Sequence, residues 1–356
     1  MRRQAITATA LTALALLAMA PPAQATYDPI GSGATKLTLD KSFVSFLKAD
    51  GIELTASAGA KRKGATITLP VTAGNMDPTV GQGEIDQTGT ITFQNQRKRV
   101  PWRNLVVKTK HSPLIAKVGG SQLKLATSSK LSSKREGFGT AFGAGALKLT
   151  AKVATRLDKK LRPEVPFTQG RLLGTLSSNA QPALVTILEQ GRATVALDSA
   201  FVAKMDAHFV SINPIFPAEH LVSGFTFPII VGSQIAPDAS QGTLRTGGAL
   251  EFLQLHAGQV FWHEPWLDLG ARSDSAEVDV EPVPTFPGKL GRLGILDLGA
   301  ATVASEPEAR TISVSGASLS LQAAAAKTLN EAFASGKEDF KAGETVGSVS
   351  FVAQGQ

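Results

Sequence analysis

The chain has 356 residues, a formal net charge of +7 and no cysteine. Its length predicts about two domains, and the lack of cysteine excludes a disulfide scaffold, a thiolate metal site, an iron–sulfur cluster and a thiol nucleophile. A hydrophobic share of 43% with a charged share of 18% excludes disorder over most of the chain.

The first 25 residues have the pattern of a secretory signal peptide. Arg2 and Arg3 precede an apolar run that ends at Pro21 and Pro22, and Ala23-Gln24-Ala25 forms a small-x-small cleavage site. The apolar run is shorter than the roughly 20 residues that span a bilayer. We therefore expect residues 1–25 to be removed, a secreted or extracytoplasmic protein, and no transmembrane segment after the signal peptide.

The next 150 residues predict several strands and two helices. Asp40 is a plausible N-cap, followed by Phe43, Phe46 and Leu47 at helical spacing. Residues 65–71 and 89–93 alternate with period two, as strands do, and 104–110 contain an apolar run that turns basic. Residues 149–161 place Leu or Val at every fourth position, which predicts a helix with one packed face.

The same blocks then recur further along the chain, which indicates an internal duplication. Residues 39–44 reappear at 197–202, 69–71 at 227–229, and the Phe-x-x-Gly-x-x-x-Gly pattern that begins at Phe167 begins again at Phe340. Strands are expected at 266–271 and 276–283, and a helix at 321–333. We predict a mainly β fold of two tandem homologous β-sandwich-like domains, 33–178 and 190–353, each with one or two short helices, joined by a linker at 179–189.

Three motifs resemble the HtaA-type, haem-transport-associated domains of secreted and cell-surface actinobacterial proteins. They are Gly247-Gly248-Ala249-Leu250-Glu251-Phe252, Pro265-Trp266-Leu267-Asp268-Leu269, and Phe340-Lys341-Ala342-Gly343-Glu344-Thr345-Val346-Gly347-Ser348-Val349. The resemblance extends over nearly the whole mature chain, as two copies. It implies a β-rich domain that binds haem through an axial Tyr with a nearby His.

The residues at the implied haem positions depart from that pattern. The Tyr position is Phe46 in the first copy and Lys204 in the second, while the only tyrosine, Tyr27, precedes both copies. The His position has no histidine in the first copy, whereas His256 stands near it in the second. Because a fold does not fix its ligand, the resemblance leaves haem as a possible cofactor of the second copy.

A second group of candidate haem contacts lies in Trp262-His263-Glu264-Pro265-Trp266. His263 or His256 could replace the axial ligand, with Trp262 and Trp266 against the macrocycle. The alternative is that the tryptophans fill the core and His263 lies in a loop. The spacing matches no zinc signature, and the sequence has no G-x-S-x-G elbow or P-loop, so we expect neither a metal site nor catalytic residues.

Charge is divided unequally between the halves. Residues 26–180 hold 24 Lys and Arg against 10 Asp and Glu, whereas residues 181–356 hold 10 against 19. Basic clusters occur at Lys61, Arg62, Lys63, at Arg97, Lys98, Arg99, and at Lys159, Lys160, Arg162. A solvated surface, a docking site for an anionic envelope polymer, and attraction between the halves all remain open; nucleic acid is not expected, because the protein is exported.

Two functions follow from these observations. The first is an exported, non-enzymatic envelope protein that binds haem or another hydrophobic anionic ligand, which requires a pocket between the helix at Asp198–Met205 and the strand at Leu250–His256. The second is a structural or adhesive envelope protein with a degenerate pocket, docked on an anionic polymer through its basic first half. This second hypothesis predicts that Phe43, Phe46 and Phe93 fill the corresponding space in the first domain.

Overall fold

The computed structural model describes residues 27–96, 98–109, 113–118, 121–128, 130–222, 224–255, 258–281, 288–334 and 337–356. The predicted signal peptide and two candidate residues, Arg97 and His256, lie outside these ranges. The prediction of a mainly β protein is confirmed, since the described residues form long antiparallel strands with only short helices. None of the described helices is long and apolar enough to cross a membrane.

The first half is built from one sheet and two helices. In chain order the elements are β1 (Asp28–Leu39), α1 (Lys41–Ala49), β2 (Glu53–Ser57), β3 (Lys61–Lys63), β4 (Thr66–Asp77), β5 (Gln82–Asn95), β6 (Lys98–Lys108), β7 (Pro113–Val118), β8 (Ser121–Thr127), β9 (Leu131–Glu136), β10 (Gly139–Leu149), α2 (Ala151–Leu161) and β11 (Leu172–Pro182). Hydrogen bonding runs β4-β5-β6-β7-β8-β10-β11-β1 and returns to β4, so the sheet closes on itself around a core.

The second half repeats this arrangement. Its elements are β12 (Val185–Leu197), α3 (Ser199–Ala207), β13 (Val210–Ile215), β14 (Glu219–Leu221), β15 (Gly224–Pro228), β16 (Gln234–Ile235), β17 (Gly242–Arg245), β18 (Ala249–Gln254), β19 (Gly258–Asp268), β20 (Ser273–Glu281), β21 (Lys289–Leu298), β22 (Thr302–Glu306), β23 (Thr311–Leu321), α4 (Ala323–Phe333) and β24 (Thr345–Gly355). The path β12-β16-β17-β19-β20-β21-β23-β24 again returns to its start. The faces of the predicted sandwich are therefore parts of one continuous sheet in each half.

The two halves correspond strand by strand. The long strand β4 of the first half is divided into β15 and β16 in the second, and β5 is divided into β17 and β18. Ladder registers align as well: Leu37 faces Leu176 across β1 and β11, and Val195 faces Val349 across β12 and β24. Each position in one interior therefore has a counterpart in the other.

The predicted helices begin at the expected caps. Asp40 accepts a hydrogen bond from the Ser42 N–H at 2.8 Å, and Asp198 accepts one from the Ala200 N–H at 2.8 Å. Such a side chain satisfies backbone donors that the first turn leaves free. The predicted strand at 266–271 ends earlier, at Asp268, because its carboxylate accepts the Ala271 N–H in a turn.

The predicted linker at 179–189 is wrong. Residues up to Pro182 belong to β11 and residues from Val185 belong to β12, so the halves are joined by two residues. The polar Ser, Asn and Gln of this stretch suggested a loop, but they alternate with buried residues and occupy the outward positions of a strand.

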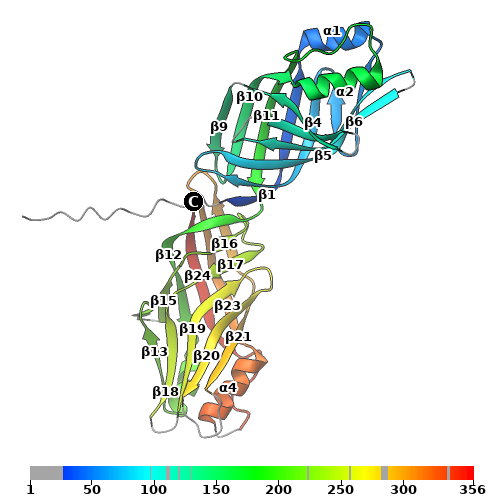
Figure 1. The fold of residues 1–356 in the computed structure, drawn as a ribbon. Coiled ribbons are helices and arrows are strands. Elements are labelled where there is room, and N and C mark those ends of the chain that lie inside the picture. The colour runs from blue at the N-terminus through cyan, green and yellow to red at the C-terminus, as the bar shows by residue number, and fades with distance from the viewer. Residues whose placement is uncertain are drawn as a thin grey trace, which may run out of the picture.

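The two closed sheets meet end to end (Figure 1). The Asp28 carboxylate accepts the Thr186 N–H at 2.9 Å, and Pro29 accepts the Ala183 N–H through its carbonyl at 2.7 Å. Phe138, from the first half, packs into the core of the second. Burial raises the pKa of Asp28, opposed by its bond from Thr186 and by the charge of Arg135. A buried side chain and main-chain bonds thus connect the halves.

Candidate ligand-binding site

Both interiors contain the same aromatic pair. Phe93 and Trp102 lie 4.5 Å apart between ring centroids in the first half, and Phe252 and Trp262 lie 4.5 Å apart in the second. All four side chains are at most 2% exposed. What differs between the halves is the space beside this pair.

In the first half that space is filled by aromatic rings. Phe43 of α1 meets Phe93 edge to face, with ring centroids 6.4 Å apart. Phe46 packs against Phe167 at 4.9 Å and is covered by the Arg171 guanidinium at 3.8 Å. Phe46 therefore packs inward, as the hypothesis of a filled first domain requires.

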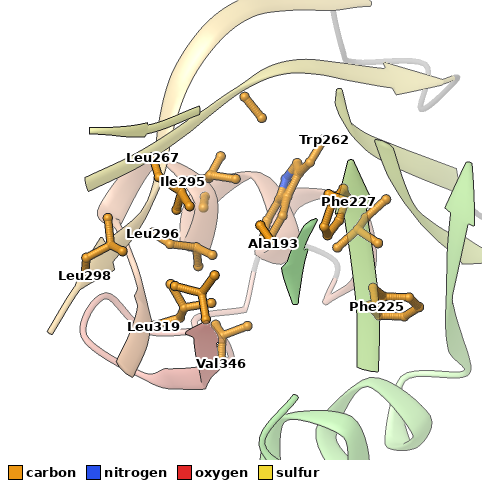
Figure 2. Packing of buried hydrophobic residues seen from close by; sticks show 14 of the residues in the cluster. Ala193, Phe225, Phe227, Trp262, Leu267, Ile295, Leu296, Leu298, Leu319 and Val346 are labelled. Carbon is orange, nitrogen blue, oxygen red and sulfur yellow. The ribbon is translucent and has the colours of Figure 1, made fainter. Parts of the chain in front are cut away.

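In the second half an apolar cavity occupies the corresponding region. Its boundary includes Leu197 at the end of β12, Phe201 of α3, and Leu250 and Phe252 of β18. The binding hypothesis requires a pocket between this helix and this strand. Figure 2 shows Trp262 reaching between Phe227 on one side and Ile295 and Leu296 on the other. The cavity has a volume of about 30 Å³, room for about two water molecules, so a larger ligand enters only if its walls move apart.

Three side chains that line the cavity are smaller than their first-half counterparts, whereas Phe227, Leu267 and Leu296 are larger than Leu69, Val107 and Ala126. Val195, Val346 and Val349 line it, and the ladders place Leu37, Leu173 and Leu176 at the equivalent sites of the first half. Each Leu-to-Val difference removes one methylene from a core that otherwise has the density of an organic crystal. Gaps of this kind persist because the surrounding strands collapse only partly.

Two further matched positions enlarge the same space. In the first half the Gln87 amide donates to the Thr35 hydroxyl at 3.2 Å, inside the sheet. Thr246 and Ala193 stand at these two places in the second half, and both line the cavity. At these two positions the second half has smaller side chains and lacks that hydrogen bond, although Phe351 stands opposite Ala193 where Ser178 stands opposite Thr35.

One carboxyl group lies in this apolar wall. Asp274 of β20 lines the cavity, is 5% exposed, and has one carboxyl oxygen, Oδ1, without a hydrogen-bond partner among the described residues. Burial raises its pKa to about 8, opposed by the charge of Arg292 and by backbone hydrogen bonds from Ser275 and Trp266. At neutral pH the group is therefore mainly a neutral acid that can donate a hydrogen bond.

A second unpaired donor lines the same cavity. The Trp262 indole N–H is buried and has no acceptor among the described residues. Buried indole N–H groups usually find a partner, and an unpaired one costs about 1–3 kcal/mol. The Trp102 indole N–H, at the same place in the first half, is also buried and unpaired, so Asp274 is the polar group that distinguishes the wall of the second-half cavity.

The sequence-predicted aromatic residues lie on opposite faces of β19. Trp262 points inward, whereas His263 and Trp266 are on the outer face, where Trp266 is stacked between Arg245 and Arg292 at 4.4 and 3.7 Å. Side chains alternate along a strand, and the irregular step at Glu264, with φ of 46°, puts Trp266 outward as well. The structure therefore does not bring these residues together into one pocket.

The described residues do not fit the haem site that the resemblance implies. Lys204, at the tyrosine position, forms an ion pair with Glu344 beside the Phe340 ring. The Nε2 atom of His263 faces the Asp279 carboxylate at 3.5 Å on the outer surface, away from the cavity. Among the described residues, no group of three or more His, Cys, Asp or Glu side chains could hold a metal ion.

The basic clusters of the first half lie along connected strands. Lys61, Arg62 and Lys63 form β3 and are all exposed, and Arg62 donates to the Leu54 carbonyl of β2. β2 pairs with β5, and the next strand, β6, begins with the exposed Lys98 and Arg99. Asn95, the last residue of β5, donates to the carbonyl of Leu161, the last residue of α2, and the exposed Lys159, Lys160 and Arg162 flank that residue.

Asp274 was missed by the sequence analysis, although a signal for it exists. In the second half Asp274 pairs with Leu267 on one side and Leu296 on the other. The residue with the equivalent neighbours in the first half is Leu114, which pairs with Val107 and Ala126. Extending the repeat comparison through β20 would have shown an acid where the first copy has a buried leucine. The short motifs used to find the repeat do not reach this strand.

No family model matches this chain, and no curated protein does. Among solved structures it is similar to the C-terminal domain of HtaA from Corynebacterium glutamicum, with 14% identity, a TM-score of 0.34, and coverage of 44% of this chain and 98% of that one. It is also similar to the N-terminal domain of that protein, with 18% identity, a TM-score of 0.37, and coverage of 48% and 99%. These values are too low to decide what this chain binds.

Proposed function

We propose that this chain is an exported, non-enzymatic binding protein whose second half holds a small apolar ligand inside its closed sheet. The observation that carries the proposal is the apolar cavity beside Phe252 and Trp262, where Val195, Val346 and Val349 replace leucines of the first half. An apolar cavity with a few polar groups is the usual form of a small-molecule site. The predicted signal peptide supports export.

The sheet has a place where a ligand can enter without breaking a main-chain ladder. Within the described residues β13 pairs with β18, and β14 pairs with β15, but β13 and β14 are not paired with each other. Ile212 of β13 lines the cavity. Separating these two edges costs side-chain contacts but no ladder hydrogen bonds, which makes it the least costly way to widen the cavity.

The direct test is a calorimetric titration of residues 26–356 with 1-octanol, with tryptophan fluorescence as a second readout. We expect one saturable site per chain and a change in fluorescence, because Trp262 lines the cavity. The double substitution Val195→Leu and Val349→Leu installs the first-half residues and is expected to lower the affinity at least 10-fold by filling the space.

The first half provides the matched control. Leu37→Val and Leu176→Val make the reverse change at the equivalent positions and should leave octanol binding unchanged. Octanol binding that survives filling of the second-half cavity would overturn the proposal.

Haem is tested in the same preparation. A titration followed in the Soret region, with His256→Ala and His263→Ala variants, distinguishes haem from an aliphatic ligand. We expect no saturable Soret band, because the described residues supply no axial ligand inside the cavity. A band that disappears in one His variant would favour haem at that histidine instead.

A second candidate function rests on the exposed basic residues. The surface formed by Lys61, Lys63, Lys98 and Arg99 is solvent-exposed and belongs to the half with excess positive charge. Such a surface suits an anionic envelope polymer, and binding to it would weaken with salt.

We expect charge reversal of this surface to weaken binding to an anionic polymer. Lys61→Glu, Lys63→Glu, Lys98→Glu and Arg99→Glu together should reduce retention on immobilised polyphosphate at 50 mM salt by at least 10-fold, measured by surface plasmon resonance. A control with Lys289→Glu, Lys327→Glu, Lys337→Glu and Lys341→Glu in the second half reverses the same number of charges elsewhere. Equal loss in both variants would show that only net charge matters and that no docking surface exists.

A further inference from the structure

We infer that the second-half cavity selects an uncharged ligand headed by a hydrogen-bond acceptor, with Asp274 and Trp262 as the donors that receive it. The inference rests on the proposed function and deepens it, since it names the chemical class of the ligand. It also departs from the sequence-based expectation of a hydrophobic anion.

Asp274 stands in the cavity wall at a position where the first half has a leucine. Its neighbours in the ladder are Leu267 and Leu296, and the equivalent site of the first half is the buried Leu114. An acid in place of a core leucine carries a desolvation cost, which the backbone hydrogen bonds from Ser275 and Trp266 offset only in part. Its Oδ1 is without a partner among the described residues and lies at the cavity wall.

Arg292 of β21 is the charged residue that acts on Asp274, and its charge lowers the pKa of that carboxyl group. Arg292 itself points outward, where its Nε atom lies 3.3 Å from the Glu277 carboxylate. β19 on the other side presents Leu267 and the backbone of Trp266, and Arg245 of β17 is engaged on the outer face of Trp266. No described residue that lines the cavity is a cation, and burial raises the pKa of Asp274 to about 8, so its carboxyl group is mainly protonated at neutral pH.

The polar groups in the wall determine which ligand the cavity accepts. A protonated carboxyl and an indole N–H both donate, so they suit a carbonyl, ether or hydroxyl oxygen. A carboxylate ligand would bring its charge to a wall in which no described lining residue is a cation, and an ammonium would pair only with ionised Asp274, which burial disfavours at pH 6. The remainder of the cavity, walled by Val, Leu, Ile and Phe, suits the hydrocarbon part.

The test compares four eight-carbon ligands that differ in their head group. At pH 6 the affinities of the mature chain for 2-octanone, 1-octanol, octanoate and octylammonium are measured by calorimetry. We expect the ketone and the alcohol to bind at least 10-fold more tightly than either ion. At pH 9.5 the ketone should bind at least 10-fold more weakly, because ionised Asp274 no longer donates.

Two variants assign the preference to Asp274. Asp274→Asn keeps an N–H donor that does not titrate, so the ketone should bind with similar affinity at both pH values. Asp274→Leu should lose the pH dependence and bind the ketone more weakly than the wild type does at pH 6, because one of its donors is gone, while both ions remain excluded by the apolar wall. Circular dichroism of each variant confirms that the fold is retained.

The outcomes separate this inference from the proposed function. Equal binding of ketone and octanoate, or an unchanged affinity for the ketone at pH 6 in Asp274→Leu, would overturn the inference while leaving an apolar site in place. Binding of none of the four ligands would overturn the proposed function as well.

Discussion

The stability of the second half is expected to fall steeply as pH rises from 5 to 9. The pKa of Asp274 is raised from its ordinary value of 3.8 to about 8 by burial. Between these two values the folded chain holds a proton that the unfolded chain has released, so the free energy of unfolding decreases with pH across this window. At about 1.4 kcal/mol per pKa unit, the full effect is on the order of 5 kcal/mol.

Two substitutions isolate this effect, measured by urea unfolding at pH 5, 7 and 9. Asp274→Asn cannot ionise and should flatten the pH dependence. Asp274→Leu, which copies Leu114, should do the same and also exceed the wild-type stability at pH 9 by several kcal/mol, since replacing buried ionic groups by packed apolar ones often stabilises. A wild-type curve that is flat between pH 5 and 9 would show that Asp274 reaches solvent or a buried cation.

Truncating the helix phenylalanine should cost more in the first half than in the second. Phe43 is completely buried and contacts the rings of Phe46, Phe93 and Phe167. Phe43→Ala is expected to lower the free energy of unfolding by about 3–5 kcal/mol, the range for a large aromatic in a packed core.

The equivalent change in the second half is Phe201→Ala. Phe201 already faces the cavity, so it has fewer partner atoms to lose, and we expect a cost at least about 1 kcal/mol smaller than for Phe43→Ala. Chemical denaturation of both variants, followed by tryptophan fluorescence, measures the difference. Equal costs would indicate that the cavity closes in solution.

Much of the fold could be predicted because it depends on local patterns. The caps at Asp40 and Asp198 mark two helices, and period-two alternation marks the strands that form the walls. The recurrence of short blocks also located matching elements, such as the helices that contain Phe43 and Phe201. These features are set by neighbours a few residues apart, and a sequence displays them directly.

The candidate site depended on contacts between distant strands. An irregular step at Glu264 places Trp262 and Trp266 on opposite faces of β19, because it shifts which side chains point inward. The residue types around Glu264 do not indicate such a step. The same limit applies to the stretch 179–189, whose polar residues suit either a loop or the outer face of a strand.

The amino-acid pattern was sufficient to show that this protein is mainly β, begins with a signal-peptide pattern, and carries opposite charge in its two halves. It did not show that the second half contains a cavity or that Asp274 lies in its wall. A cavity is the sum of volume differences of both signs, such as Val195 for Leu37 and Phe227 for Leu69, on strands that the fold brings together. No single residue records that sum until the sheet has closed.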